Sequence, residues 1–156
     1  MQVSPETRAI VIDFTTTARK KERKMKNISD LAAGFYEIVN GEGELGDVLS
    51  DDFQFGIMPG FPFGGVQDGL EASKAFFEKL GPLFDNFEVH AEEFIPIDDT
   101  NLVVKGFYRA KATKTGKEVD FETVHFWVSN GEKLTHYKHY CDTGLLCDAL
   151  GYHVPQ

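Results

Sequence analysis

One part of the sequence decides the fold: Val119-Asp-Phe-Glu-Thr-Val-His-Phe-Trp-Val128, a turn at Ser129-Asn-Gly-Glu132, and then Lys133-Leu-Thr-His-Tyr-Lys-His-Tyr-Cys141. Polar and apolar residues alternate in both segments, which predicts two β-strands joined by the turn. Because successive side chains of a strand point to opposite faces, His125 shares a face with large apolar residues. An imidazole in such surroundings can titrate near neutral pH and act as an acid or a base.

The turn between these strands leaves two registers open. A two-residue turn at Asn130-Gly131 would pair His125 with His136 and place His139 on the opposite face. A three-residue loop over 129–131 would instead put the odd-numbered residues of both strands on one face. We favour this second register, because it gives one continuous inward face that combines histidine, tyrosine and apolar side chains.

Two further strands are predicted before this pair, over residues 87–97 and 101–113. The four strands are joined by short links, which indicates an antiparallel meander. In the strand 101–113, the even-numbered residues, among them Tyr108, form the inner face. Glu93 falls at a position of its strand whose side chain would point inward. It is either an inward carboxylate with a raised pKa or the sign of a β-bulge that turns it outward, and we favour the bulge.

Helical periodicity predicts three helices, over residues 31–40 after a cap at Ser29-Asp30, over 69–80, and over 143–150 after a cap at Asp142. Between the first two lie a short helix near 45–49, an alternating strand at 53–57 and a Gly- and Pro-rich loop at 58–65. Helices that precede a meander predict an α+β fold, in which the helices pack on the concave face of a curved antiparallel sheet.

Composition limits the classes of partner. The 156 residues fit one domain, and the net charge of −9 disfavours binding to nucleic acid. The basic residues concentrate in the first 26 positions. With two cysteines, no recognisable signal peptide and no apolar stretch long enough for a membrane span, the sequence predicts a cytoplasmic protein.

The chain divides into three parts. Residues 1–27 form a polar, partly basic arm or helix, residues 28–150 form the folded domain, and residues 151–156 form a C-terminal tail. The arm has helix-start features at Ser4-Pro5, but three consecutive threonines weaken the predicted helix.

Several short motifs of the domain resemble those of one superfamily. They are Phe35-Tyr-Glu-Ile-Val-Asn40, Leu49-Ser-Asp-Asp-Phe53, Gly64-Gly65 before a helix that begins at Gly69, and His125-Phe-Trp127 followed by Tyr140-Cys-Asp142. In this order and spacing they resemble SnoaL-like proteins of the nuclear transport factor 2 and ketosteroid isomerase superfamily (NTF2-like). The resemblance covers about residues 28–150. It implies a cone of curved sheet around a hydrophobic pocket, closed by helices, and a homodimer formed through the sheet.

The resemblance implies several functions, since this superfamily contains cyclases, isomerases and pockets without a reaction. SnoaL-like cyclases carry an acid/base carboxylate on the last strand and a histidine on the strand before it. In this chain His125 takes the histidine position and His139 takes that of the carboxylate. Steroid isomerases have an aspartate late in the first strand, where this chain has 56–58, Gly-Ile-Met. The familiar steroid isomerisation is therefore not expected.

The candidate site combines these two lines of reasoning. We expect His125 and His139 to act as an acid/base pair and Tyr137 to orient a substrate oxygen, although each histidine can equally be a hydrogen-bonded core residue. The expected substrate-binding residues are Tyr36, Phe55, Ile57, Phe61, Tyr108, Phe121, Thr123, Trp127 and Cys141. No metal site is expected, because His136 and His139 face opposite ways and fit no zinc motif.

The sequence thus predicts a pocket protein for a hydrophobic small molecule. The reaction would be a proton transfer without a cofactor, of the isomerase, cyclase or hydratase type. The alternative is a binding or dimeric association module of the same fold without catalysis. A pocket that is filled by Phe and Tyr side chains would favour the alternative.

Overall fold

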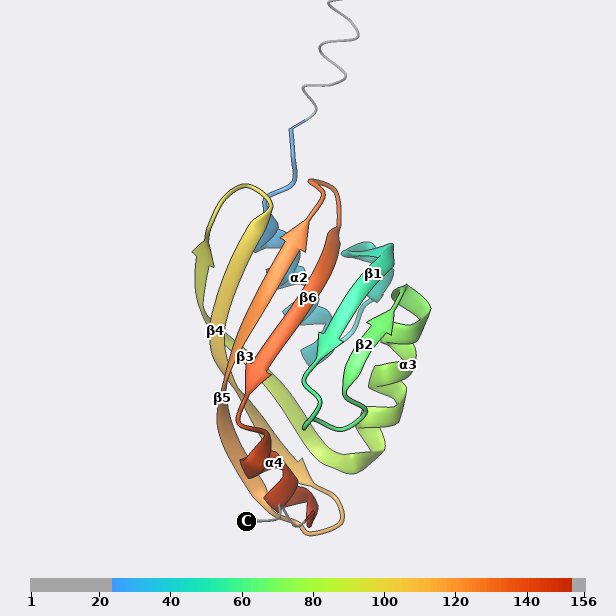
Figure 1. Cartoon of the computed structure of the whole chain (residues 1–156), viewed down its shortest axis with the longest axis vertical. Helices are drawn as coiled ribbons and strands as arrows, with labels where there is room; N and C mark the ends of the chain where they lie inside the picture. Colours follow the sequence, from blue (N-terminus) through green and yellow to red (C-terminus); the bar gives the residue numbers. More distant parts are fainter. Residues whose placement is uncertain (1–23, 153–156) are drawn as a thin grey trace, which may run out of the picture.

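The computed structural model describes residues 24–152, which form one curved, open sheet and the helices packed on it (Figure 1). The strands are β1 (Leu49–Ile57), β2 (Gly65–Asp68), β3 (Phe84–Pro96), β4 (Asn101–Ala112), β5 (Glu118–Ser129) and β6 (Leu134–Cys141). The helices are α2 (Ile28–Asn40), α3 (Leu70–Leu80) and α4 (Thr143–Leu150), with 3₁₀ turns at Leu45–Asp47 and Gly81–Leu83. Most of the predicted arm and tail, including the helix expected from Ser4, lies outside the described residues.

The sheet has the strand order β2-β1-β6-β5-β4-β3. Strands β3 to β6 form the predicted antiparallel meander. Strand β1 pairs with β6 in parallel, however, so the sheet is mixed rather than purely antiparallel. The short strand β2, which the sequence had placed partly in a loop, pairs with β1 at the free edge. A strand of four residues is too short to be recognised from an alternating pattern.

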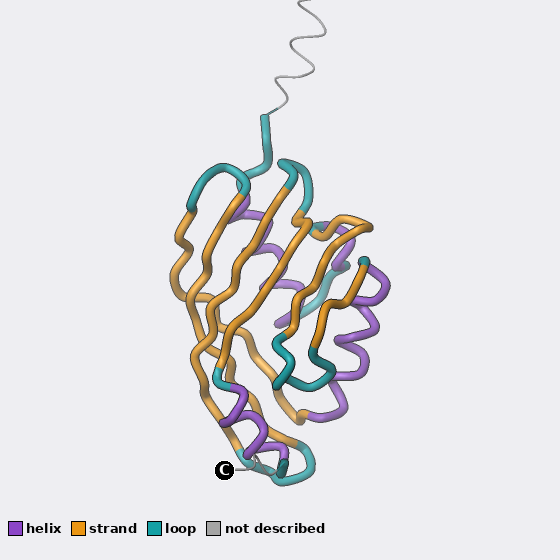
Figure 2. The backbone as a smooth tube through the Cα atoms, viewed as in Figure 1, coloured by secondary structure: helices purple, strands orange, loops and turns teal. Residues whose placement is uncertain are grey.

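The helices form a second layer, as expected for an α+β fold. Helices α2 and α3 cover the concave side of the sheet, and α4 lies at the far end beside β5 (Figures 1 and 2). Apolar side chains one turn apart, such as Leu31 and Phe35 on α2, point into the core. There Phe35 packs edge-on against Trp127 of β5, with ring centroids 4.8 Å apart. The described residues contain no helix that is long and apolar enough to cross a bilayer.

Helix α2 starts earlier than predicted. Its N-cap is Asn27, whose side-chain oxygen accepts hydrogen bonds from the amides of Ser29 (2.8 Å) and Asp30 (3.3 Å). Asn27 has the extended backbone that a cap requires, whereas the predicted cap residues already belong to the first turn. The cap of α4 is the predicted one, since Asp142 accepts from the amide of Leu145 at 3.1 Å.

A β-bulge in β3 confirms the expectation for Glu93. The β3–β4 register shifts between Ala91 and Glu93, and the Glu93 carboxylate is exposed and pairs with Lys105 at 3.5 Å. Gly106 of β4 lies opposite the bulge, where a Cβ atom would overlap the carbonyl oxygen of His90. The bulge and this close approach bend the strand pair inward, which helps to curve the sheet around the core.

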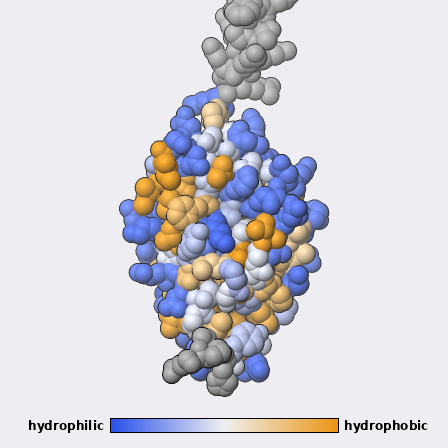
Figure 3. All heavy atoms as spheres, viewed as in Figure 1, coloured by the Kyte–Doolittle hydropathy of each residue, from blue (hydrophilic) through white to orange (hydrophobic). Residues whose placement is uncertain are grey.

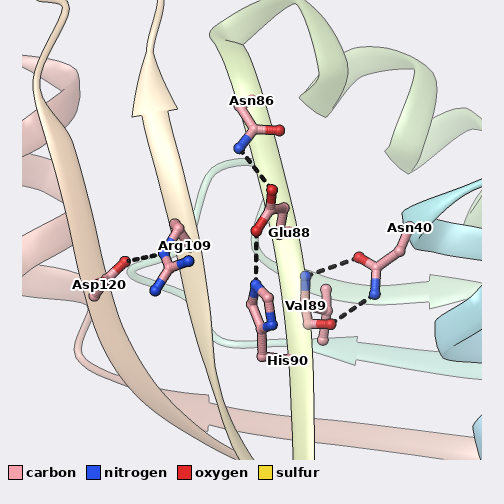
Figure 4. Close-up of polar contacts among 7 residues, drawn as sticks. All are labelled: Asn40, Asn86, Glu88, Val89, His90, Arg109 and Asp120. Carbon is pink, nitrogen blue, oxygen red and sulfur yellow. Dashed lines mark hydrogen bonds and ion pairs between the residues drawn. The ribbon is translucent and has the colours of Figure 1, made fainter.

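Strand β3 forms one edge of the sheet, and α2 protects part of it (Figure 4). The Asn40 side chain accepts a hydrogen bond from the amide of Val89 (2.9 Å) and donates one to its carbonyl (2.7 Å). These contacts occupy backbone groups that would otherwise be free to pair with another strand. They also tie the last residue of α2 to the wall of the cone.

Candidate functional site

The hairpin of β5 and β6 places the two candidate histidines opposite each other. His125 pairs with His139, and Trp127 pairs with Tyr137, so the predicted shared inward face is confirmed. The loop itself differs from the prediction, because it spans the four residues 130–133 rather than 129–131. Next to Ser129 the pairing shifts, so that β6 has one residue more than β5 at this point. The odd-numbered residues of both strands therefore stay on the same face of the sheet.

The local sequence explains this longer loop. The Asn130 side chain accepts hydrogen bonds from the amides of Glu132 and Lys133, both at 2.9 Å. Gly131 adopts a φ of 89°, which a residue with a side chain rarely takes. The hydrogen bonds to the Asn130 side chain therefore favour the four-residue loop over a tight two-residue Asn-Gly turn.

A small aromatic cavity of about 30 Å³ lies between α2, α3 and the sheet. Seven of the predicted site residues line it: Phe55, Ile57, Phe61, Tyr108, His125, Tyr137 and His139. A water molecule needs at least roughly 10–15 Å³, and ligand pockets commonly measure roughly 300 Å³ or more. The cavity thus has room for one or two waters, and a larger guest requires the surrounding side chains to move.

Five other predicted site residues lie outside the cavity lining. Phe121 packs on Tyr108, with ring centroids 5.2 Å apart. The Thr123 hydroxyl donates a hydrogen bond to the carbonyl of Tyr140 at 3.2 Å. Burial raises the pKa of the Cys141 thiol to about 12, which disfavours the nucleophilic thiolate. The remaining two, Tyr36 and Trp127, belong to a hydrogen-bonded cluster behind the cavity wall.

The sequence prediction missed the part of the lining that the helices and β3 supply. These residues are Phe35, Val39, Phe76, Phe77, Leu80, Phe87 and Val89. Two pairs, Phe35 with Val39 and Phe76 with Leu80, have the four-residue spacing of one helix face. That spacing indicates an inward face, but only the packing tells which inward residues border a cavity.

His125 lies at the centre of the polar cluster. Its Nδ1 atom is 2.7 Å from the hydroxyl of Tyr36, and its Nε2 atom is 2.7 Å from the hydroxyl of Tyr108. The indole N–H of Trp127 donates to Tyr36 at 2.9 Å. Both ring nitrogens of His125 therefore have partners, although the ring is only 2% exposed.

His139 is held from two sides. The amide of Met58 donates to its Nε2 atom at 3.1 Å, and its Nδ1 atom is 2.9 Å from the hydroxyl of Tyr108. The same Tyr108 hydroxyl lies 3.1 Å from that of Tyr137. Tyr108 thus joins both histidines and the second tyrosine into one network.

Burial keeps this network uncharged at neutral pH. Desolvation lowers the pKa of His139 to about 4 and that of His125 well below its usual value. Desolvation likewise raises the pKa of Tyr36, Tyr108 and Tyr137. Since the Met58 amide donates to Nε2 of the neutral His139, the proton of this ring must sit on Nδ1 and point to Tyr108.

This arrangement defines the chemistry that the site can support. Neutral imidazoles and phenols can bind an oxygen atom and shift a proton without holding a charge. Across residues 24–152, no group of three His, Cys, Asp or Glu side chains is placed to hold a metal ion.

Comparison with known proteins identifies the fold. No family model and no curated protein matches the sequence. Among solved structures, an NTF2-like protein of unknown function from Burkholderia pseudomallei is 20% identical, with a TM-score of 0.72 over 81% of this chain and 98% of that one. A protein described as a SnoaL-like polyketide cyclase, from Jannaschia sp. CCS1, is 14% identical, with a TM-score of 0.71 over 85% and 97%.

A third similar structure contains a bound molecule. TerC, crystallised with polyporic acid, is 21% identical, with a TM-score of 0.65 over 80% of this chain and 95% of that one. The resemblance seen in the sequence is thus confirmed at the level of the fold. The chain has the NTF2-like fold.

Proposed function

We propose that this protein binds a hydrophobic small molecule that carries a carbonyl oxygen, and that Tyr137 donates a hydrogen bond to this oxygen. The observation that carries the proposal is a neutral Tyr-His cluster at one wall of an otherwise aromatic cavity. Apolar walls with a few convergent polar groups are typical of ligand sites. TerC, a protein of the same fold, was crystallised with polyporic acid, which supports this proposal.

Ligand entry requires the cavity to grow. The segment 58–64 is the best candidate to move, because it carries Phe61, whose ring lies 4.9 Å from that of His139 and closes the cavity beside it. The same segment begins at Met58, whose amide occupies Nε2 of His139. Displacement of this segment would therefore open the cavity and release the lone pair of His139 together.

The proposed reaction is a proton transfer next to the carbonyl, as in isomerisation, cyclisation or hydration. His139, once released, takes the proton from the carbon as the base. Tyr137 gives its proton to the developing enolate oxygen and regains one from Tyr108, and Tyr108 regains one from Nδ1 of His139, so that the site is neutral again. The distances of 2.9 and 3.1 Å along this path suit proton transfer. No metal or cofactor takes part in the proposed step.

A matched pair of probes tests the binding. Acetophenone and ethylbenzene have similar shapes, but only acetophenone has a carbonyl oxygen. We expect wild-type protein to bind acetophenone about tenfold more tightly, since one hydrogen bond is worth about 1.4 kcal/mol. Trp127 fluorescence or chemical-shift titration measures both affinities. Tyr137→Phe should remove the difference, and Tyr140→Phe, on the outer face, should keep it.

The same ketone tests the reaction. In D₂O, proton abstraction would exchange the methyl hydrogens of acetophenone for deuterium, which NMR detects. We expect Tyr137→Phe and His139→Gln to slow the exchange by a factor of about 10²–10⁴. Binding without exchange would leave the non-catalytic alternative, which the small volume of the cavity favours. No binding of either probe would contradict the proposal as a whole.

We further propose that two copies associate through the outer face of the sheet. The exposed apolar side chains of this face include Val66, Phe126 and Tyr140. Figure 3 shows hydrophobic patches between hydrophilic residues on the side of the molecule that it draws. The rings of Phe126 and Tyr140 pack edge to face, with centroids 5.7 Å apart. Exposed aromatic side chains of this kind are enriched at protein interfaces. Sedimentation should show a dimer for the wild type and a monomer for Phe126→Asp. A wild-type monomer would contradict this proposal.

A further inference from the structure

The buried polar cluster contains one more hydrogen than its bonds require. Six hydrogen bonds join the three tyrosines, the two histidines and the N–H groups of Met58 and Trp127. When neutral, these seven groups have one hydrogen each to donate. One donor must therefore be left over, and its position depends on the direction in which the bonds run.

Two bonds fix the borders of the cluster. Trp127 can only donate, so Tyr36 accepts from it. His139 accepts from Met58 at Nε2, so its Nδ1–H donates to the oxygen of Tyr108. Only the bonds between Tyr36, His125, Tyr108 and Tyr137 can reverse. We call these four residues the relay.

The relay has two complete arrangements. In the first, Tyr36 donates to Nδ1 of His125, Nε2–H of His125 donates to Tyr108, and Tyr108 donates to Tyr137. The hydroxyl hydrogen of Tyr137 is then left over, at the cavity that this residue lines. Every other donor in the cluster has an acceptor.

In the second arrangement, every bond of the relay runs the other way. Tyr137 donates to Tyr108, Tyr108 donates to Nε2 of His125, and Nδ1–H of His125 donates to Tyr36. The surplus hydrogen is now that of Tyr36. This residue also lines an open groove on the outside, between α2 and β3, together with Glu37, His90 and Glu92.

We propose that the relay is a two-state proton path between the cavity and the outer groove, and that the tautomer of His125 marks its state. In the first state Tyr137 offers a donor to a carbonyl oxygen, and in the second it offers an acceptor to an enol hydroxyl. The proposal rests on the proposed function for the identity of the ligand, but the two states follow from the hydrogen bonds alone.

The proton balance of the path closes. When Tyr137 gives its proton to a ligand oxygen, it regains one from Tyr108, Tyr108 regains one from His125, and His125 regains one from Tyr36. Tyr36 then takes a proton from water in the outer groove. One proton has left at the cavity and one has entered at the groove, so the first state has become the second and the cluster is neutral again.

This balance also assigns roles to Tyr36, Trp127 and His139. Tyr36 is the outer end of the path, and Trp127 is a positioning residue that holds the Tyr36 oxygen by its indole N–H. His139 sets the direction at Tyr108, because its Nδ1–H occupies one acceptor position of that oxygen. The relay therefore needs a proton on Nδ1 of His139.

Histidine ring ¹⁵N shifts test the relay without ligand or turnover, since they distinguish the two neutral tautomers. Tyr137→Phe removes the oxygen to which Tyr108 donates in the first state. Within the relay, the hydroxyl hydrogen of the buried Tyr108 then has an acceptor only at Nε2 of His125. We expect His125 in this variant to carry its proton on Nδ1 fully, with unchanged His139. Tyr140→Phe, outside the cluster, should leave the wild-type spectrum of His125 unchanged.

Several outcomes would overturn the proposal. His125 with its proton on Nε2 in Tyr137→Phe would contradict the two-state path. A proton on Nε2 of His139 in the wild-type protein would also contradict the two-state path. This observation does not depend on whether any variant folds. Addition of acetophenone to the wild type should shift His125 toward the Nε2–H tautomer. If the variant behaves as expected but acetophenone neither binds nor shifts His125, the relay stands and the proposed ligand class is wrong.

Discussion

His125 and His90 are both hydrogen-bonded histidines, but they lie in opposite environments. His125 is buried inside the cone between two tyrosine hydroxyls, and desolvation lowers its pKa. His90 is half-exposed on β3, where its ring stacks on Phe107 with centroids 4.7 Å apart and contacts the Glu88 carboxylate at 2.6 Å (Figure 4). The inner histidine depends on neutral partners, whereas the outer one has water and a carboxylate within reach.

The comparison teaches which polar contacts hold the fold. Buried polar groups that lose a partner cannot turn to water, so each lost bond carries a full desolvation cost. Surface pairs such as His90–Glu88 and Arg109–Asp120 can exchange their partners for solvent, and their net contribution is small. We therefore expect the inner cluster to govern stability and the outer pairs to be replaceable.

The largest effect is expected for His125→Ala. This change leaves the hydroxyls of Tyr36 and Tyr108 short of a partner and opens a void at the centre of the core. The free energy of unfolding should fall by about 3–5 kcal/mol. Urea denaturation measures this, and a loss below about 1 kcal/mol would show that the cluster does not support the fold.

The pH dependence of stability should come from the inner histidines. Their pKa values are lower in the folded state than in the unfolded state, so between pH of about 6.5 and about 4 the unfolded chain binds more protons. The free energy of unfolding should therefore decrease as the pH falls, by up to about 1.4 kcal/mol per pH unit for each histidine. His139→Gln should flatten this slope, as measured by urea denaturation across this pH range.

A smaller effect is expected at the sheet edge. Asn40→Ala removes both hydrogen bonds to Val89, but the freed backbone groups are exposed to water. The unfolding free energy should fall by about 1–2 kcal/mol, as measured by urea denaturation. Asn40→Asp is the matched control, because a carboxylate can still accept from the Val89 amide but cannot donate to its carbonyl. Equal losses in both variants would mean that only the carbonyl contact matters.

The smallest change in stability is expected for His90→Ala. The hydrogen bond from His90 is the main cause of the lowered pKa of Glu88, with a further contribution from Asn86. Without His90, the pKa of Glu88 should rise toward its usual value while the unfolding midpoint hardly moves. Carboxyl ¹³C shifts across a pH titration report the first quantity. A large loss of stability would erase the distinction between the two regions.

Much of the fold could be predicted from sequence because it depends on local patterns. Alternation identified the strands of the meander, and the inward parity of Glu93 correctly predicted a bulge. Two features escaped. The parallel pairing of β1 with β6 joins distant segments, and no local pattern specifies a partner at that distance. The cap at Asn27 was missed because the next two residues are equally good capping types.

The site was predictable in part for the same reason. Strand parity placed His125, Tyr137 and His139 on one face, and the structure has them there. Parity could not tell that Trp127 and Tyr36 bond to each other rather than border the cavity, since that depends on how α2 packs. Nor could it give the volume of the cavity, which depends on the fit of helical and strand side chains together.

The pairing of β1 with β6 has a consequence for synthesis on the ribosome. Strand β1 can pair early with β2, but its other edge finds its neighbour only when β6, near the end of the described domain, has been made. Until then the nascent chain exposes this open edge, and Phe53 and Phe55 lack their contacts with Trp127 and Tyr137, which invites premature association. Completion of this fold therefore waits for the last strand, and non-local pairing of this kind folds slowly.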